Sequence, residues 1–238
     1  MNKKAFALIF CSFLLIPAVC RAEATEVIAI VGAMREETEP ILVRMSVTTS
    51  YTHENAMIWK GSLNGKDVIL AQCGIGQKNA EKCTSFLLNN YTVGALIFCG
   101  VGGSTKLDIG TDEVVISSEI MSLNPFETYE TDDGLASIAL NNSFDFDVHY
   151  GRFYTATPLM LDEFILYPYL WIRGVKCVEM ENLPMAEIAA ERGVPFLSVR
   201  GVSDQIPLLP FMFLQYRRHA DVAAEHAAAV VAGLVADM

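Results

Sequence analysis

Short apolar runs rich in β-branched residues alternate with helix-like segments along this chain, and this alternation restricts its fold more than any other feature. Two of the runs, Glu26–Val31 and Ala95–Cys99, end directly in glycines. A third run, Phe196–Val202, follows a helix-like segment and ends in Ser203-Asp204. Continuous apolar runs of this length are typical of strands that are buried on both faces. The alternation therefore predicts an α/β fold with a largely parallel sheet between helices.

Two further segments have readable local patterns. Asn64-Gly65 separates two strand-like runs, Met57–Gly61 and Lys66–Cys73, and this predicts a tight hairpin turn. The stretch Ile120–Asp147 is polar and irregular. We expect it to be a loop near the functional site or on the surface.

The C-terminal part of the chain contains two predicted helices. Glu181–Arg192 has apolar residues at helical spacing, and Gly193 is expected to end that helix. Arg217–Met238 is rich in alanine and is expected to dock by its apolar face. A proline-rich aromatic segment, Ile206–Phe213, is expected to lead into it.

The N-terminal segment Met1–Ala22 has the pattern of a secretory signal peptide. Basic residues precede an apolar core, Ala5–Ile16, and a proline and small residues follow it. The apolar core is too short to span a membrane. We expect cleavage after residue 22, or alternatively after residue 24, and export of residues 23–238 as a single domain to the periplasm or the medium.

The balance of charge argues against two classes of partner. The whole chain has 17 basic and 28 acidic residues, a net charge of −11. The predicted leader holds three of the basic residues and no acidic one, so residues 23–238 would carry a net charge of −14. Such a surface repels nucleic acid and anionic membranes. We therefore expect neither as a partner.

Four cysteines lie outside the predicted leader, at Cys73, Cys83, Cys99 and Cys177. Their spacings contain no metal-ligand pair, and three of them lie in or beside apolar runs. We expect buried free thiols, with a disulfide as the alternative in an oxidising compartment.

Carboxylates gather at the ends of the predicted elements. Glu37 follows the first strand, Glu179 and Glu181 stand at the head of a helix, and Asp204 ends the last strand. Side chains at the ends of sheet strands often meet in one site. Each acid also has a structural interpretation, because acids are favoured in the first turn of a helix and aspartate is favoured in turns and caps.

Five short motifs occur in a fixed order along the chain. They are GAMREE at Gly32–Glu37, CGIG at Cys73–Gly76, CGVGG at Cys99–Gly103, VEMEN at Val178–Asn182 and VRGVSD at Val199–Asp204. Together they resemble the purine nucleoside phosphorylase superfamily, and most closely the 5′-methylthioadenosine/S-adenosylhomocysteine nucleosidases. The resemblance implies a three-layer α/β/α sandwich around a central mixed, largely parallel sheet. It also implies a hydrolase that splits adenine from a 5′-thio-substituted ribose, typically as a homodimer with no metal or organic cofactor.

The resemblance assigns roles to individual residues. Asp204 would be the acid that protonates or hydrogen-bonds the adenine N7, and Glu37 would orient and activate the attacking water. Glu181 would accept the ribose hydroxyls. The further substrate contacts that it implies are at Met34, Gly102, Met160, Glu179, Met180 and Ser203. An N-glycosidic bond breaks through an oxocarbenium-like state and needs a protonated base as leaving group, which is why carboxylates suit the reaction.

Three alternatives remain open. Phosphorolysis would need cationic groups for the phosphate, but Gly74–Gln77 and Ala95–Ser104 contain no arginine, and the first motif has only Arg35. Hydrolysis is favoured for that reason. The second alternative is a related nucleosidase for another base, such as a futalosine hydrolase-like activity. The third is a nucleoside-binding protein without catalysis.

Overall fold

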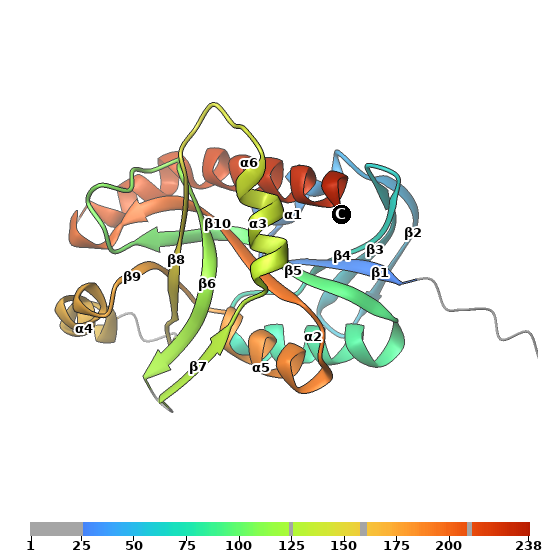
Figure 1. Cartoon of the computed structure of the whole chain (residues 1–238), viewed down its shortest axis with the longest axis horizontal. Coiled ribbons are helices and arrows are strands. Elements are labelled where there is room, and N and C mark those ends of the chain that lie inside the picture. Colours follow the sequence, from blue (N-terminus) through green and yellow to red (C-terminus); the bar gives the residue numbers. More distant parts are fainter. Residues whose placement is uncertain (1–25, 124–125, 158–160, 209–210) are drawn as a thin grey trace, which may run out of the picture.

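The computed structural model describes residues 26–123, 126–157, 161–208 and 211–238, which form one mixed sheet with helices on both faces (Figure 1). The strands are β1 (Val27–Gly32), β2 (Ser46–His53), β3 (Ala56–Leu63), β4 (Lys66–Gln72), β5 (Val93–Ser104), β6 (Val114–Leu123), β7 (Phe126–Glu130), β8 (Val148–Thr155), β9 (Val175–Glu179) and β10 (Phe196–Gln205). The helices are α1 (Arg35–Leu42), α2 (Gln77–Asn90), α3 (Asp133–Asn141), α4 (Leu161–Ile172), α5 (Asn182–Arg192), α6 (Met212–Asp237) and the short 3₁₀ helix η1 (Ile206–Leu208). The predicted leader lies outside the described residues and stays a prediction.

Strand β5 joins two parts of the sheet. The strand order is β10-β6-β8-β9-β5-β1-β4-β3-β2, with β7 paired to β6. Strand β10 also pairs with β5 in parallel, from Phe196 opposite Leu96 to Gln205 opposite Ser104. The strands β5, β10, β6, β8 and β9 therefore close into a ring. Strands β1, β4, β5 and β10 run in the same direction, so their carboxyl ends meet at one edge.

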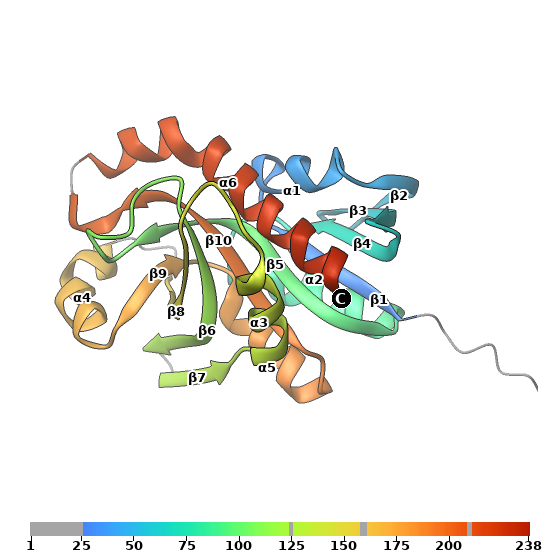
Figure 2. The same cartoon turned by 45° about the horizontal axis from the view of Figure 1, so that its top comes forward.

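Alternate residues of the buried strands face two separate hydrophobic clusters. Ala29 and Val31 of β1 belong to the cluster that contains α2 and α5, while Ile28 and Ile30 belong to the cluster that contains α1, α3 and α6. Figure 1 shows α6 on one side of the sheet and α2 and α5 on the other, and Figure 2 shows α6 crossing the sheet with α1 beside it. The predicted three-layer sandwich is confirmed, because side-chain alternation along each strand supplies apolar surface to both helical layers.

The two sharpest local predictions are confirmed. Strands β3 and β4 pair antiparallel across Asn64-Gly65, whose φ angles of 51° and 80° are the left-handed values that a two-residue type I′ hairpin requires. Gly193 ends α5 with a φ of 65°, again in the left-handed region.

The prediction of a loop over Ile120–Asp147 is wrong. Strand β6 continues to Leu123, β7 pairs back onto it, and α3 follows. Asp132 caps α3 by accepting a hydrogen bond of 2.8 Å from the backbone N–H of Leu135. The segment looked irregular because β7 is mostly exposed and polar, so pairing with β6 rather than hydrophobic patterning holds it in the sheet.

Two predicted boundaries also change. Strand β5 does not end at Cys99 but runs through the glycines to Ser104, so these glycines lie within a strand and not in a turn. Helix α6 begins at Met212 rather than at Arg217, because the buried Met212 anchors an additional first turn. Within the described part of the chain, no helix has both the length and the apolar character needed to cross a membrane.

Candidate active site

A cavity of about 510 Å³ lies at the carboxyl ends of the parallel strands. It is lined by every predicted site residue that the structure describes, namely Met34, Glu37, Gly102, Glu179, Met180, Glu181, Ser203 and Asp204. Met160 lies outside the described residues. The acids reach one cavity because β1 leads into α1, β9 leads into α5 and β10 ends beside β5. The interpretation of the acids as separate helix or turn residues does not predict this convergence.

Glu37 is held in place by backbone donors. Its Oε2 atom accepts hydrogen bonds from the N–H groups of Ala33 (2.6 Å) and Met34 (3.0 Å), and its Oε1 atom accepts one from Val101 (2.9 Å). The side chain is only 1% exposed. A side chain at Gly100 would collide with this carboxylate, so glycine is required there. Burial raises the pKa of Glu37, although the cation of Arg200 lowers it.

Arg200 is the site residue that sequence reasoning missed. Its guanidinium is 1% exposed and donates from Nη2 to Glu179 Oε2 (2.9 Å) and Glu181 Oε2 (3.1 Å). Its Nη1 atom lies 3.8 Å from Glu37 Oε1. The sequence signal was a lone arginine inside an otherwise apolar strand, since a buried charge needs partners. Burial lowers the pKa of Arg200, but the three carboxylates together raise it by more than burial lowers it. The side chain therefore stays charged.

This cluster places three carboxylates around one guanidinium. The excess of carboxylates disfavours a phosphate anion and favours a positively charged sugar. Arg35, the arginine of the first motif, is exposed and pairs with Glu39 at 2.9 Å. Neither of these two arginines is therefore free to hold a phosphate beside the buried acids.

Glu179 and Glu181 differ in what they can still bind. Glu179 accepts from the hydroxyl of Thr155 with one oxygen, and with the other from Arg200 and from the N–H groups of Glu181 (2.7 Å) and Asn182 (2.8 Å). It thus caps α5 and positions Arg200. Burial raises its pKa. Glu181 has fewer protein partners, the N–H of Gly76 at 2.8 Å and Arg200, which leaves acceptor capacity for sugar hydroxyls.

Asp204 presents one unoccupied carboxyl oxygen. Ser203 donates a hydrogen bond of 2.7 Å to its Oδ1 atom, and no described residue is hydrogen-bonded to Oδ2. A side chain at Gly103 would lie 3.0 Å from that oxygen, so glycine keeps the space beside it open. Burial raises the pKa of Asp204, and the Ser203 hydrogen bond lowers it. A carboxyl of raised pKa with a free oxygen is suited to donate a proton to a ligand.

The outer part of the cavity is lined by the first turns of α6. Tyr216 is half-buried and its hydroxyl donates to the sulfur of Met34 at 3.5 Å. Phe213 and Arg217 also line the cavity and are exposed. The wall of the cavity thus changes from buried acids inside to apolar and basic side chains outside.

The cysteines do not take part in this arrangement as ligands or disulfides. All four are buried free thiols, which confirms that prediction. Burial raises the pKa of each, for example to about 12 for Cys83. Among the described residues, no group of histidines, cysteines and acids is arranged to hold a metal ion.

Known proteins resemble this chain along most of its length. The family model of the phosphorylase superfamily matches residues 27–236. A 5′-methylthioadenosine/S-adenosylhomocysteine nucleosidase from Geobacillus sp. (strain WCH70) is 28% identical over 235 residues, which cover 89% of this chain and 98% of the relative. A protein of the same name from Exiguobacterium sp. is 29% identical over 198 residues, which cover 74% of this chain and 84% of the relative.

Solved structures share the fold. The nucleosidase of that name from Neisseria meningitidis, in complex with methylthio-immucillin-A, superposes with a TM-score of 0.81 at 22% identity and covers 90% of this chain and 100% of its own. A futalosine hydrolase of Helicobacter pylori superposes with a TM-score of 0.78 at 21% identity and covers 90% of this chain and 98% of its own.

Proposed function

The chain belongs to the phosphorylase superfamily, and we propose that it hydrolyses the N-glycosidic bond of 5′-methylthioadenosine and S-adenosylhomocysteine, releasing adenine and the thioribose. One observation carries the proposal. A single cavity combines the buried Asp204, which has a free oxygen, with a cluster in which carboxylates outnumber the guanidinium of Arg200. The names of the relatives from Geobacillus and Exiguobacterium support the substrate class.

Asp204 is the general acid in this proposal. Burial keeps its carboxyl protonated to a higher pH than an exposed aspartate, so it can donate to the adenine N7 as the bond to the sugar breaks. Ser203 fixes the other oxygen and so orients the carboxyl. Protonation turns adenine into a better leaving group, which is the main chemical demand of the reaction.

The opposite charge develops on the sugar, and the acid cluster stabilises it. Glu37 and Glu181 supply negative charge near the forming oxocarbenium ion, and Glu181 accepts hydrogen bonds from the ribose hydroxyls. Glu37 also orients the attacking water, because three backbone N–H groups fix its carboxylate. Arg200 lies beside both acids, 3.1 Å from Glu181 and 3.8 Å from Glu37, so its positive charge offsets part of the cost of burying them.

Purified protein offered 5′-methylthioadenosine, S-adenosylhomocysteine, adenosine and inosine, each with and without phosphate, tests the proposal. We expect each of the two thionucleosides to release adenine at the same rate with phosphate as without it. Release that requires phosphate would make the protein a phosphorylase. Hypoxanthine from inosine as the faster product would assign another base, and no release from any nucleoside would favour binding alone.

Export and dimerisation belong to the same proposal. The signal-peptide pattern of Met1–Ala22 supports export, and the resemblance to dimeric nucleosidases supports a homodimer. Mass spectrometry of the protein from the periplasm and the medium tests the first, since it detects the loss of residues 1–22 or 1–24. Light scattering of the purified protein tests the second, and a monomer mass would contradict it.

A further inference from the structure

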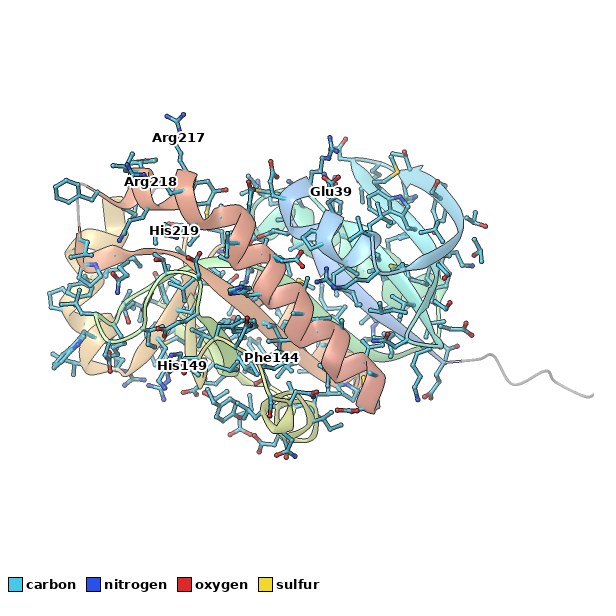
Figure 3. All side chains as sticks on the ribbon, turned by 90° about the horizontal axis from the view of Figure 1, so that it is seen from above. Glu39, Phe144, His149, Arg217, Arg218 and His219 are labelled. Carbon is cyan, nitrogen blue, oxygen red and sulfur yellow. The ribbon has the colours of Figure 1, made fainter. Side chains whose placement is uncertain are left out.

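Arg217 is a cation at the outer wall of the cavity that is not paired with any residue the structure describes. It lines the cavity from α6, one residue after Tyr216, and its side chain is exposed. No hydrogen bond or ion pair joins it to any residue in the described ranges. Figure 3 shows it near the beginning of α6, extending beyond the ribbon. The other arginine of the cavity, Arg200, is buried and already pairs with Glu179 and Glu181, so Arg217 is the one whose charge a ligand can use.

The position of Arg217 determines which part of a nucleoside can reach it. The base lies at Asp204 and the sugar at Glu181 in the proposed function, and both carboxyls are buried. Phe213 and Arg217, in contrast, are exposed lining residues at the outer wall. The part of the substrate that leads from a buried sugar to this wall is the 5′ substituent. Phe213 offers apolar contact for a thioether chain, and Arg217 offers charge at its end.

We propose that Arg217 binds a carboxylate at the end of the 5′-thio substituent, so that the protein prefers nucleosides with an amino-acid-like tail over those with a short neutral one. This inference rests on the proposed function and deepens it. A guanidinium is suited to a carboxylate because it offers parallel N–H donors. The acids of the cavity and the net charge of −11 repel the carboxylate of such a tail, so a nearby cation is needed to hold it.

The expected effect is modest, because the side chain is exposed. An exposed ion pair contributes little free energy in water, and its loss should weaken the binding of the substrate by about 2- to 5-fold. The contact is remote from the bond that breaks, so it acts equally on the ground state and the transition state. It should therefore change KM rather than kcat.

The test compares three adenine nucleosides that differ only in the 5′ tail. They are S-adenosylhomocysteine, 5′-deoxy-5′-(3-aminopropylthio)adenosine, which lacks the carboxylate but keeps the ammonium group, and 5′-methylthioadenosine. The variants are Arg217→Ala and Arg217→Glu, with Arg218→Ala as the matched control. Arg218 is the neighbouring exposed arginine on the same helix and does not line the cavity.

The measured quantity is the ratio of kcat/KM for S-adenosylhomocysteine to that for its decarboxylated analogue. We expect Arg217→Ala to lower this ratio about 2- to 5-fold through KM, Arg217→Glu to lower it further, and Arg218→Ala to leave it unchanged. High salt should lower the ratio of the unsubstituted protein toward that of Arg217→Ala. A ratio that Arg217→Ala leaves unchanged, or that Arg218→Ala lowers equally, would overturn the inference.

The same experiment separates this inference from the proposed function. If the unsubstituted protein releases adenine and the ratio does not depend on Arg217, only the inference fails. If no adenine is released, the proposed function fails, and calorimetric affinities for the same three nucleosides replace kcat/KM as the measured quantity. If Arg217→Ala then lowers the ratio of the affinity for S-adenosylhomocysteine to that for its decarboxylated analogue, the carboxylate contact is supported. If none of the three nucleosides binds, the inference fails together with the proposed function.

Discussion

Replacing Arg200 with methionine tests whether one buried guanidinium holds the carboxylates of the cavity together. Its Nη2 atom lies 2.9 Å from Glu179 and 3.1 Å from Glu181, and the side chain is 1% exposed. Methionine keeps apolar volume over the ring of Phe98 but removes the charge. Removing one partner of a buried ion pair typically costs about 3–5 kcal/mol, because the remaining charge is left uncompensated. We expect the free energy of unfolding at pH 7.5 to fall by about that amount.

The loss of stability in Arg200→Met should depend on pH, and the pKa values of the neighbouring carboxyls determine whether it grows or shrinks as pH rises. Burial raises the pKa of Glu37 and Glu179, and Arg200 lowers both, so both pKa values rise further without it. A carboxyl with a raised pKa binds more protons folded than unfolded. Its contribution to stability is therefore complete below the unfolded pKa and is lost as pH rises through the folded pKa. The deficit of the variant should thus be smaller at pH 5 than at pH 7.5, by about 1 kcal/mol or more.

Urea unfolding at the two pH values, followed by tryptophan fluorescence, measures both effects. Arg35→Met is the matched control, because Arg35 also pairs with a glutamate but its side chain is 76% exposed. We expect this control to leave the free energy of unfolding nearly unchanged, because exposed ion pairs contribute little to stability. Adding Glu179→Gln to Arg200→Met should restore part of the loss at pH 7.5. Equal deficits at both pH values, or a larger deficit at pH 5, would refute the electrostatic reasoning.

Three further predictions concern the acid and the packing beneath it. Asp204→Asn should lower kcat about 10²- to 10⁴-fold in single-turnover assays while the affinity is retained, and near-normal turnover would exclude Asp204 as the acid. The value of kcat should fall as pH rises through the raised pKa of Asp204, because the acid must be protonated; a rate independent of pH from 5 to 9 would contradict this. Gly102→Ala should lose about 1–3 kcal/mol in thermal unfolding, since its Cβ would lie 2.6 Å from Cys177 Sγ and 2.9 Å from the carbonyl oxygen of Val178. Unchanged stability would show that β5 and β9 can separate.

Local chemistry made much of the fold predictable. A short β-branched run predicted the buried strand β1, and a glycine after a helical pattern predicted the end of α5. Strand β2 (Ser46–His53) had no such signal, because nearly all of its residues are exposed and its place at the edge of the sheet depends on pairing with β3. Pairing of this kind is a long-range property that a linear pattern does not contain.

The same distinction applies to the site. Glu37, Glu181 and Asp204 were predictable because they belong to short motifs at the ends of elements. The role of Arg200 was not, because it depends on acids that come from α1, from the last residue of β9 and from the turn that follows it. Arg217 was assigned to the start of an alanine-rich helix, and only the packing of α6 against the cavity gives it a ligand-facing position.

The ring of strands also determines how much of the chain must be synthesised before the cavity of the candidate site can form. Strand β5 cannot complete its pairing until β10 has been synthesised, because Leu96 pairs with Phe196. Asp204 lies near the end of β10. Pairings between such distant segments form slowly and only after much of the chain is available. A nascent or truncated chain that ends before β10 therefore lacks both Arg200 and Asp204. Any chain long enough to contain the proposed acid therefore also contains the strand that closes the ring.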